Sequence, residues 1–406
     1  MHIGIIGAGT SSAVAILAMA DIWLSDKNFF QSFHITCLND PSVPVSQVGE
    51  SISPSVIRIL HSVLGLDFLE ALPNFDGTPR YFSKYFLSEQ GDENFYTWHM
   101  MPGAHANSQK FSRYVIDAIK QKHSFLTEIN DTAESITQTD TNAVVNCKNN
   151  IYKFDFVINC SGTPTIEEIH SEEYNTDVFE SMNSVVIFPE LKKYEEPFTS
   201  VHFHGHGWMF GVPLTFRKAW GYLYNNKFTS QEEACNSFGK LKNIDATDLR
   251  KISWQPYYKK KALDGRILSL GNQLYFFEPQ HAIPLHYYLN LTVQFLYQML
   301  HLTVEQLNIK LNNFHEHQME QVQNIIALNY IRDPKYDTEF WKHIRPKAIQ
   351  QLKNSKDFQL WLKKCLTYNK FFEYFTHDSF IMKYYIEGYN IDLTSLQNDT
   401  PNFILT

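Results

Sequence analysis

The sequence has few cysteines and no long uncharged apolar run, and each absence argues against a class of protein. The five cysteines of the 406 residues form no CxxC pair and no framework spacing, which favours reduced thiols in a cytoplasmic protein. No stretch approaches the roughly 18 continuous apolar residues of a membrane span. The chain starts directly with an apolar strand, without a basic segment and an apolar block, so we expect no signal peptide.

Positive charge is also scarce. The net charge is −8 and the pI is about 6.1, and no basic stripe could bind a phosphate backbone. Nucleic acid is therefore not an expected partner, nor is a membrane. Aromatic residues make up 15% of the chain. Most of them are expected in a core of packed rings, and a pocket for a flat substrate is the alternative.

The first forty residues predict a βαβ unit. His2–Ile6 is typical of a buried parallel strand, Thr10–Leu24 has apolar residues at helical spacing, and Phe33–Leu38 is a second strand. Further helices are expected at 56–64 and 111–122, and strands at 152–159, 200–210 and 212–227. Beyond Pro284 four helices are expected, at 289–300, 304–311, 316–330 and 356–375. The pattern predicts an α/β nucleotide-binding core (1–285) interleaved with a mostly antiparallel sheet, and a helical region (286–406) packed on it as one interlocked unit.

Gly7-x-Gly9-x-x-Ser12 lies between the first strand and the first helix, which is the context that a dinucleotide-binding turn requires. Gly7 permits the tight turn, and Gly9 lets the backbone approach a pyrophosphate. The helix that starts at Thr10 and Ser11 then presents N–H donors to that phosphate. Ser12 replaces the third glycine with another small residue. The setting predicts nucleotide binding.

An acidic residue normally ends the second strand and holds the ribose hydroxyls. Here Asn39 and Asp40 occupy that region. Either the amide of Asn39 or the carboxylate of Asp40, one position later, must therefore bind the ribose hydroxyls.

Seven segments along the chain carry a family resemblance. They are the glycine turn, Gly49-Glu50-Ser51 with Pro54, Asp155–Gly162, Gly207–Leu214, Gly271-Asn272 with Phe277-Glu278-Pro279, Asp337-Thr338-x-Phe340-Trp341, and Asp378-Ser379-Phe380 ahead of Glu387-Gly388-Tyr389. In this order they resemble the segments of the flavin-dependent tryptophan halogenase family.

The resemblance implies a GxGxxG-type, Rossmann-like FAD-binding fold of the flavin monooxygenase/halogenase type. It implies FAD, delivered as FADH2 by a separate flavin reductase, a halide ion and a small aromatic substrate. With the glycine turn, the implied cofactor-binding residues are Gly7, Gly9, Thr10, Ser11, Ser12, Asn39, Asp40, Gly49, Glu50, Ser51, Gly162, Gly271, Asn272 and Pro279. The implied substrate and tunnel residues are Trp208, Phe210, Pro213, Glu278 and Ile283. A homodimer is left open.

A Lys holds hypohalous acid against the substrate in this family. The gapless match to the family segment places Arg80 at that position and Lys84 at a second basic position. A guanidinium does not easily form a haloamine, so Lys84 is the expected reactive amine with Arg80 beside it. The alternative is that both are solvated surface charges.

The segment after Glu278-Pro279 departs from the family pattern. His281 stands where the family has a Glu and is a candidate base, while Pro284 stands where a Gly N–H binds halide. The missing donor favours bromide or iodide over chloride. Two alternatives remain open. If the halide step is lost, the chain is a flavin monooxygenase, and if all catalytic activity is lost, it is a catalytically silent flavin-binding protein.

His202, His204 and His206 alternate along one expected strand. Three imidazoles on one face could bind zinc, but same-face neighbours lie roughly 6–7 Å apart and rarely converge on one ion. We therefore expect them to line a pocket, and we expect no metal site.

Overall fold

A six-stranded sheet carries the N-terminal βαβ unit. The computed structural model describes residues 1–25, 33–43, 50–88, 93–193, 196–279, 283–331, 335–369, 387 and 391–397. The sheet order is β18 (Leu263–Asp264), β19 (Ile267–Ser269), β10 (Phe156–Asn159), β1 (His2–Ile6), β2 (His34–Asn39) and β6 (Leu126–Asn130). All neighbours are parallel except the β18–β19 pair.

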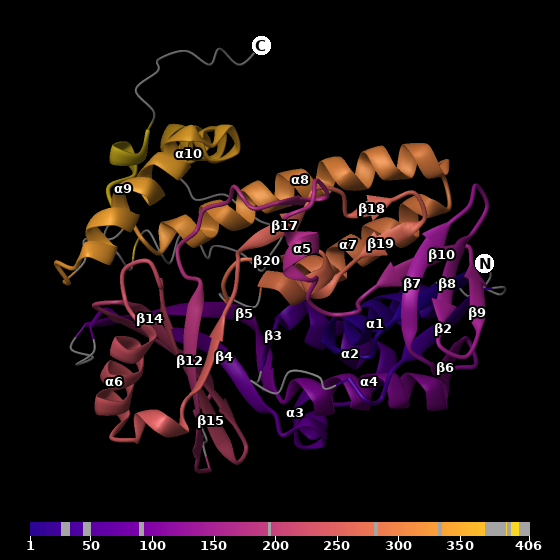
Figure 1. Ribbon diagram of the computed structural model, residues 1–406, viewed down its shortest axis with the longest axis horizontal. Helices are drawn as coiled ribbons and strands as arrows, with labels where there is room; N and C mark the ends of the chain where they lie inside the picture. Colours follow the sequence, from indigo (N-terminus) through magenta and orange to yellow (C-terminus); the bar gives the residue numbers. More distant parts are fainter. Residues whose placement is uncertain are drawn as a thin grey trace.

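Helix α1 (Thr10–Ser25) follows β1 and is buried on almost every side. It packs against α2 (Pro54–Leu64), α4 (Ser108–Lys122) and α7 (Ile283–Met299), which surround it in Figure 1. Its four buried alanines allow these helices to approach closely, and an apolar surface all round is what such a central helix requires. The N-terminal βαβ prediction is confirmed.

The expected strand at 152–159 is two strands in two different sheets. β9 (Ile151–Phe154) joins β7 (Ala133–Gln138) and β8 (Ala143–Cys147) in a three-stranded antiparallel sheet, while β10 pairs with β1. Asp155 separates them, and its carboxylate accepts the His2 N–H at 2.7 Å. Hydrophobic alternation continues through the break, so the pattern alone could not locate it.

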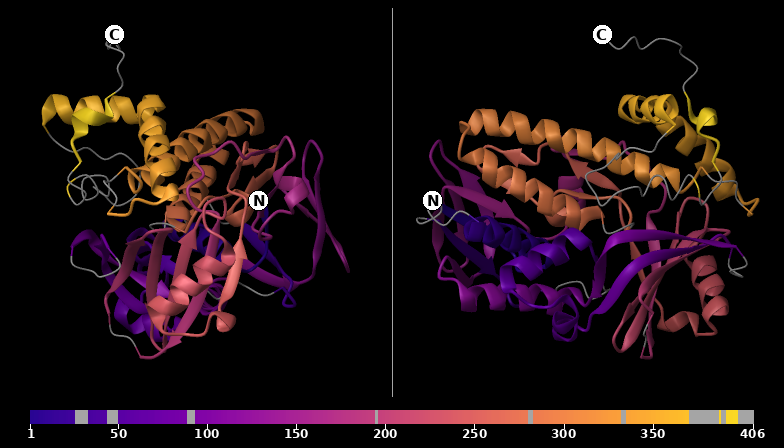
Figure 2. Two further views of the ribbon diagram at one scale, coloured as in Figure 1. Left: turned by 60° about the vertical axis from the view of Figure 1, so that its left-hand side comes forward. Right: turned by 180° about the vertical axis from the view of Figure 1, so that it is seen from behind.

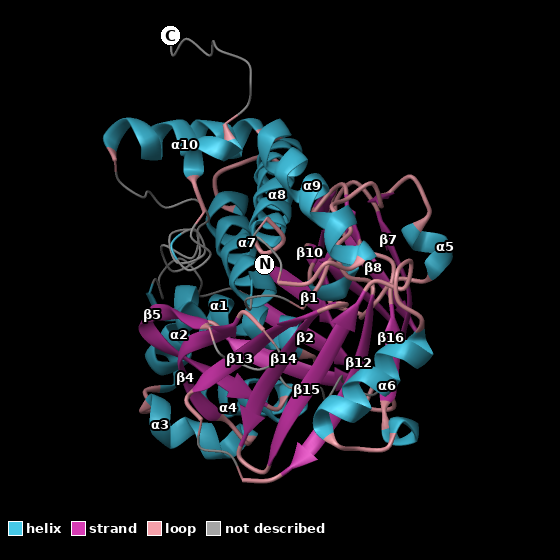
Figure 3. Cartoon of the chain, turned by 90° about the vertical axis from the view of Figure 1, so that its left-hand side faces the viewer, coloured by secondary structure: helices cyan, strands magenta, loops and turns pink. Residues whose placement is uncertain are grey.

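A second large sheet contains eight strands. Their order is β16 (Arg250–Ser253), β12 (Ser184–Leu191), β15 (Arg217–Tyr224), β14 (Gly207–Leu214), β13 (Phe198–His204), β4 (Thr78–Phe86), β5 (Asn94–Ala106) and β3 (Glu50–Ile52). One face contributes Val201, Phe203 and Trp208 to the main core. On the other face Met209 and Tyr222 cluster with residues of α6 (Gln231–Lys242). Figure 3 shows this helix lying against the sheet.

Smaller elements connect these sheets. β11 (Tyr174–Asn175), β17 (Tyr257–Lys259) and β20 (Tyr275–Phe276) form a short antiparallel sheet, and α3 (Phe68–Ala71) and α5 (Ile166–Ile169) are single helical turns.

The C-terminal helices lie together along one side of the molecule (Figure 2). The helices expected at 304–311 and 316–330 are one helix, α8 (Val304–Leu328), which a capping box between Thr303 and Gln306 starts. α9 (Glu339–Asn354) was not expected; Thr338 of the D-T motif is its N-cap. α10 (Lys356–Tyr368) follows directly. Within the described ranges, no helix is long and apolar enough to cross a membrane.

Candidate functional site

The dinucleotide turn has the geometry that its glycines predict. Gly7 has a φ of 93°, and a Cβ there would lie 2.7 Å from the Cys160 carbonyl oxygen. Next to Gly9, a Cβ would meet no protein atom within 4 Å. Gly7 is therefore required by the protein's own packing, whereas the space beside Gly9 is free for a ligand.

Two distant segments reach the same edge of the sheet as this turn. Gly162 follows β10 with a φ of 105°, and open space lies beside it. Gly271 follows β19 with a φ of 67°, and a Cβ there would lie 2.6 Å from the Ser11 Oγ. Asn272 Nδ2 donates to Thr163 Oγ1 at 3.0 Å and links the two segments. The carboxyl ends of β1, β10 and β19 thus form the crevice in which open α/β sheets bind ligands.

The first turn of α1 faces this crevice and contains no acidic residue. Its N–H groups and the helix dipole favour an anion there. Thr10 is buried, and Ser12 is fully buried beside the Cys160 thiol. A diphosphate with open glycines on both sides fits this arrangement, which is the arrangement that FAD needs.

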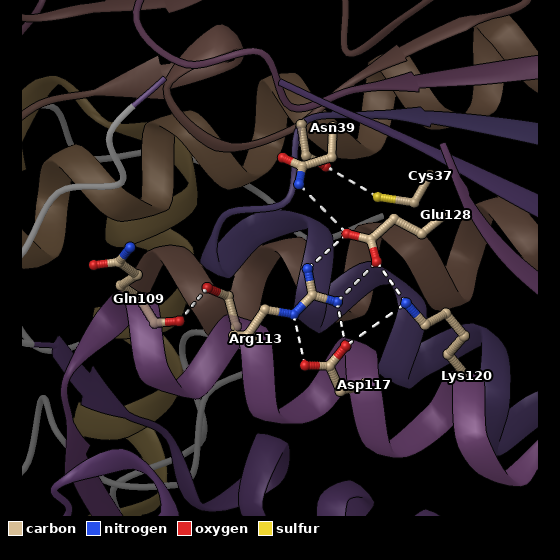
Figure 4. A network of polar contacts seen from close by, with 9 residues as sticks. Cys37, Asn39, Gln109, Arg113, Asp117, Lys120 and Glu128 are labelled. Carbon is tan, nitrogen blue, oxygen red and sulfur yellow. Dashed lines mark hydrogen bonds and ion pairs between the residues drawn. The ribbon is translucent and has the colours of Figure 1, made fainter. Parts of the chain in front are cut away.

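Asn39 and Asp40 differ in their surroundings. The Asp40 carboxylate accepts the hydroxyl of Ser42 at 2.6 Å, the hydroxyl of Thr132 at 2.7 Å and the N–H of Ser42 at 2.9 Å, which lowers its pKa. The Asn39 amide instead faces Glu128 on the neighbouring strand β6 (Figure 4). The Asp40 carboxylate thus bonds Ser42 in its own loop and Thr132 after β6, and the Asn39 amide lies at the edge of the sheet.

Ser51 belongs to a hydrogen-bonded row on the core face of the second sheet. Its hydroxyl lies 3.4 Å from that of Thr199, and the His105 ring bonds Thr199 at 2.8 Å and Thr78 at 2.9 Å. Thr78 donates to the carbonyl of Pro213 at 2.7 Å. Sequence reasoning missed His105, because a lone histidine in a strand carries no distinguishing signal.

Some predicted positions lie outside the described residues. They are Gly49, His281, the segment 378–380 and residues 388–389, and for Glu50 only the backbone, at the start of β3, is described.

Arg80 and Lys84 both lie on β4 but point to opposite faces of the sheet. A register shift between Arg80 and Phe82 leaves Arg80 on the side of Thr78 and Tyr85, the core face, where Arg80 is only 2% exposed. Lys84 is half-buried on the α6 face, with its ammonium 4.8 Å from the Phe86 ring centroid and 5.3 Å from that of Tyr96. The structure therefore places Arg80, and not Lys84, on the same face as Trp208 and Phe210.

A buried polar network connects Trp208 with Glu278. Trp208 Nε1 donates to the Tyr330 hydroxyl at 3.0 Å, which donates to Glu278 at 2.9 Å, and the Ser181 hydroxyl also donates to Glu278. Burial raises the pKa of Glu278 to about 7, although these donors oppose the rise. Ser181 and Tyr330 were not predicted, since each is a single residue in a segment without a motif.

Glu278 and Ile283 line a small cavity together with Pro284, Tyr275 and Phe277. Pro279 between them is exposed. The predicted substrate-side residues Trp208, Glu278 and Ile283 thus come together through Tyr330 and this cavity.

Phe210 lies next to Trp208, with ring centroids 6.2 Å apart. It covers Gly221 on β15, where a Cβ would lie 2.3 Å from the phenyl ring. The two aromatic side chains form one wall on the core face.

The three alternating histidines do not converge. His202 stacks on Phe86 at 4.2 Å, His204 stacks on Tyr222 at 3.7 Å, and His206 bonds the Thr229 hydroxyl at 2.9 Å. Among the residues that the structure describes, no group of His, Cys, Asp or Glu could hold a metal ion. His202 and His204 pack on the α6 face, away from the core-face wall.

The parallel sheet, its glycine crevice and the second antiparallel sheet define a dinucleotide-binding α/β protein. The model of the tryptophan halogenase family matches residues 82–392, and the chain belongs to this family. The family resemblance and the fold class expected from the sequence are both confirmed.

The relatives are distant. The chain is 23% identical to the tryptophan 7-halogenase RebH of Lentzea aerocolonigenes over 265 residues, 61% of this chain and 48% of that protein. It is 23% identical to the tryptophan 6-halogenase ThaL of Streptomyces albogriseolus over 158 residues, 36% of this chain and 28% of that protein. The chain thus spans less than half the length of these curated relatives.

Solved structures share the whole fold. A tryptophan halogenase from Shewanella frigidimarina has a TM-score of 0.81 at 16% identity, covering 100% of this chain and 90% of that one. BrvH, a flavin-dependent halogenase from Brevundimonas sp. BAL3, has a TM-score of 0.78 at 15% identity, covering 98% and 90%.

Proposed function

We propose that the chain is a flavin-dependent halogenase that uses reduced FAD, oxygen and halide to halogenate an electron-rich aromatic small molecule. The observation that carries this proposal is the convergence of the turns after β1, β10 and β19 on one open crevice, in a chain of the tryptophan halogenase family. Bound FAD would supply the oxygen activation, and a separate flavin reductase would supply FADH2.

The chain's own residues would bind the cofactor and position the oxidant. The turn from Gly7 to Ser11 would hold the pyrophosphate, because Gly9 and Gly162 have open space beside them. Arg80 would orient hypohalous acid by hydrogen bonding, because it is a buried cation on the core face. The wall of Trp208 and Phe210 would exclude water from that side.

A flavin monooxygenase is the second candidate. Pro284 favours it, because this residue in the first turn of α7 has no N–H to offer a halide.

A panel of phenols, pyrroles and indoles tests the proposal. Each is incubated with the protein, FAD, a flavin reductase, oxygen and chloride, bromide or iodide, and products are read by mass spectrometry. We expect halogenated product that requires both FAD and halide. Hydroxylated product without halogen would select the monooxygenase, and oxygen consumption no faster than that of free reduced flavin would reject both activities.

A further inference from the structure

Tyr287 of α7 and His315 of α8 form a buried hydrogen-bonded pair that the proposed halogenation does not use. The two helices pack against each other (Figure 1), and the Tyr287 hydroxyl lies 2.6 Å from His315 Nδ1. Both side chains are fully buried. The other ring nitrogen of His315, Nε2, lies 2.6 Å from the carbonyl oxygen of Lys259 on β17. The imidazole is thus held on both sides within the core.

The two hydrogen bonds of His315 define where its proton lies. A carbonyl oxygen only accepts, so Nε2 carries the hydrogen that is donated to Lys259. Burial lowers the pKa of His315 to about 4, so the ring is neutral at pH 7 and Nδ1 has a free lone pair. Nδ1 therefore accepts the hydroxyl hydrogen of Tyr287. The phenol has a base aligned with its O–H bond.

Tyr287 itself remains a phenol at physiological pH, because burial raises its pKa well above the usual value. A phenol that loses one electron becomes a far stronger acid, and it releases its proton where a base lies within hydrogen-bond distance. His315 is such a base. The pair therefore suits a reaction in which an electron and a proton leave Tyr287 together.

Two further buried tyrosines surround Tyr287. Its ring centroid lies 5.8 Å from that of Tyr275 and 6.1 Å from that of Tyr288, and the centroids of Tyr275 and Tyr288 are 5.8 Å apart. Among the described residues the Tyr275 hydroxyl has no hydrogen-bond partner, whereas Tyr287 has the imidazole. Electrons can pass between rings this close. The electron vacancy should then settle on the ring that can also release a proton to a base.

This group of three tyrosines extends towards both the crevice and the surface. Burial raises the pKa of Tyr288, and the Cys160 thiol is among the groups close enough to add to the rise. Cys160 follows β10, and its carbonyl oxygen lies against Gly7 of the dinucleotide turn. On the other side, the half-buried ring of Tyr258 lies 6.0 Å from the ring of His315, between centroids. An oxidant in the crevice or in solution thus has a short path to Tyr287.

We propose that Tyr287 is a redox-active tyrosine with His315 as its proton acceptor. A one-electron oxidant takes an electron from the phenol, the O–H bond breaks, and the proton forms a new N–H bond at His315 Nδ1. The products are a neutral tyrosyl radical and an imidazolium, and one electron from a reductant reverses both transfers. In the crevice the oxidant is a photoexcited oxidised flavin, which gains the electron by way of Tyr288. The flavin route rests on the proposed function, and it moves oxidising equivalents away from the crevice.

Oxidation by a ruthenium(III) complex tests the pair without any flavin. The full chain is mixed with a ruthenium(II) polypyridyl sensitiser and persulfate, flashed and frozen at intervals, and radicals are recorded by electron paramagnetic resonance. We expect a long-lived tyrosyl radical that is coupled to one exchangeable proton, the proton on His315 Nδ1, and this coupling should disappear in D2O. The radical should also form more slowly in D2O, because the proton moves together with the electron.

Three substitutions assign the radical. Tyr287→Phe should abolish the long-lived signal. His315→Gln keeps an acceptor for Tyr287 and a donor for Lys259 but is not basic, so the radical should form about 100-fold more slowly while the thermal midpoint stays near that of the parent. Tyr174→Phe is the matched control, because this buried hydroxyl donates to the Gln273 carbonyl, which cannot take up a proton. It should leave the radical unchanged.

A long-lived signal that survives Tyr287→Phe would overturn the proposal, and so would equal rates of radical formation in H2O and D2O. The isotope effect is measured on the parent, so it does not depend on the folding of any variant. A His315→Gln protein that forms the radical as fast as the parent would show that the hydrogen bond is only structural and would reject His315 as the proton acceptor.

Flash excitation of bound FAD, without ruthenium, tests the route from the crevice. We expect the same radical, and Tyr288→Phe should reduce its yield with FAD but not with ruthenium. Bound FAD that produces no radical at Tyr287 would overturn the route. A chain that binds no FAD but forms the radical with ruthenium would reject the flavin function and keep the redox-active pair.

Discussion

Gly9 stands at the start of α1 with open space beside its Cα atom. Gly9→Val places a branched side chain where the backbone must approach a pyrophosphate, and we expect at least about a tenfold loss of FAD affinity. Because no protein atom lies within 4 Å of the new Cβ, the thermal midpoint should change little. Fluorescence titration and thermal unfolding check both expectations. A Gly9→Val protein that binds FAD like the parent would show that the pyrophosphate lies elsewhere.

Arg80 and Lys84 offer a direct comparison of two cations on one strand. Arg80→Met should reduce halogenated product about 100-fold, because it removes the charged donor on the core face. Lys84→Met should change product formation less than about twofold, since Lys84 lies over Phe86 and Tyr96 on the α6 face. Product is measured by mass spectrometry, with FAD affinity and thermal midpoint as controls for folding. An inactive Lys84→Met beside an active Arg80→Met would restore the sequence-based choice of Lys84.

Glu278 should make stability depend on pH. Its pKa is raised from 4.5 to about 7, so the folded state binds the proton more tightly than the unfolded state. Its contribution to stability is complete below pH 4.5 and is lost as the pH rises through 7, a loss of about 3 kcal/mol in all.

The variant Glu278→Gln keeps a neutral side chain of the same shape and checks this prediction. Its unfolding free energy relative to the parent, from denaturant titrations at pH 5 and pH 8, should increase at the higher pH. Because all other groups are common to both proteins, their titration cancels in the difference. A difference that does not change with pH would show that Glu278 is ionised in the folded protein throughout.

At the scale of elements, the predicted preference among halides depends on the residues at the start of α7. The helix begins at Ile283, so Pro284 occupies its first turn, where other residues would present a free N–H. Bromination or iodination should therefore be faster than chlorination. Pro284→Ala restores the donor and should raise the rate with chloride relative to bromide.

The halogenation rates with chloride, bromide and iodide measure this preference. Pro346→Ala in α9 is the control for a general effect of removing a helical proline. Chlorination as fast as bromination in the parent would show that other donors compensate.

At the scale of the whole molecule, the proposed flavin site depends on segments that are far apart in the sequence. β1 lies between β2 and β10, and β19 completes the crevice. One hydrophobic cluster contains buried residues from Ile3 to Leu396. Limited proteolysis should therefore yield no stable FAD-binding fragment that ends near residue 150, because β10 and β19 would be missing. Mass spectrometry identifies the fragments, and a measurement of their FAD binding tests this expectation. A stable, FAD-binding fragment of that length would show that the two sheets fold separately.

Local patterns in the sequence were enough to predict the βαβ unit, the glycine turn and the family. Gly7, Gly9 and Ser12 carry this information because a strand, a tight turn and a helix each depend on neighbours within a few residues. The ordered segments predicted the fold, since seven matches in one order are specific even where each match alone is weak.

Only the tertiary structure decided which side chains meet. The register shift after Arg80 reverses the face on which each later residue of β4 points, and a hydrophobic pattern does not encode such a bulge. Likewise, Glu128 meets Asn39, and Tyr330 meets Glu278, across 89 and 52 positions of the chain. Contacts of this kind depend on strand order and helix packing. The sequence therefore determined the cofactor turn, and the packing of distant elements determined the residues around it.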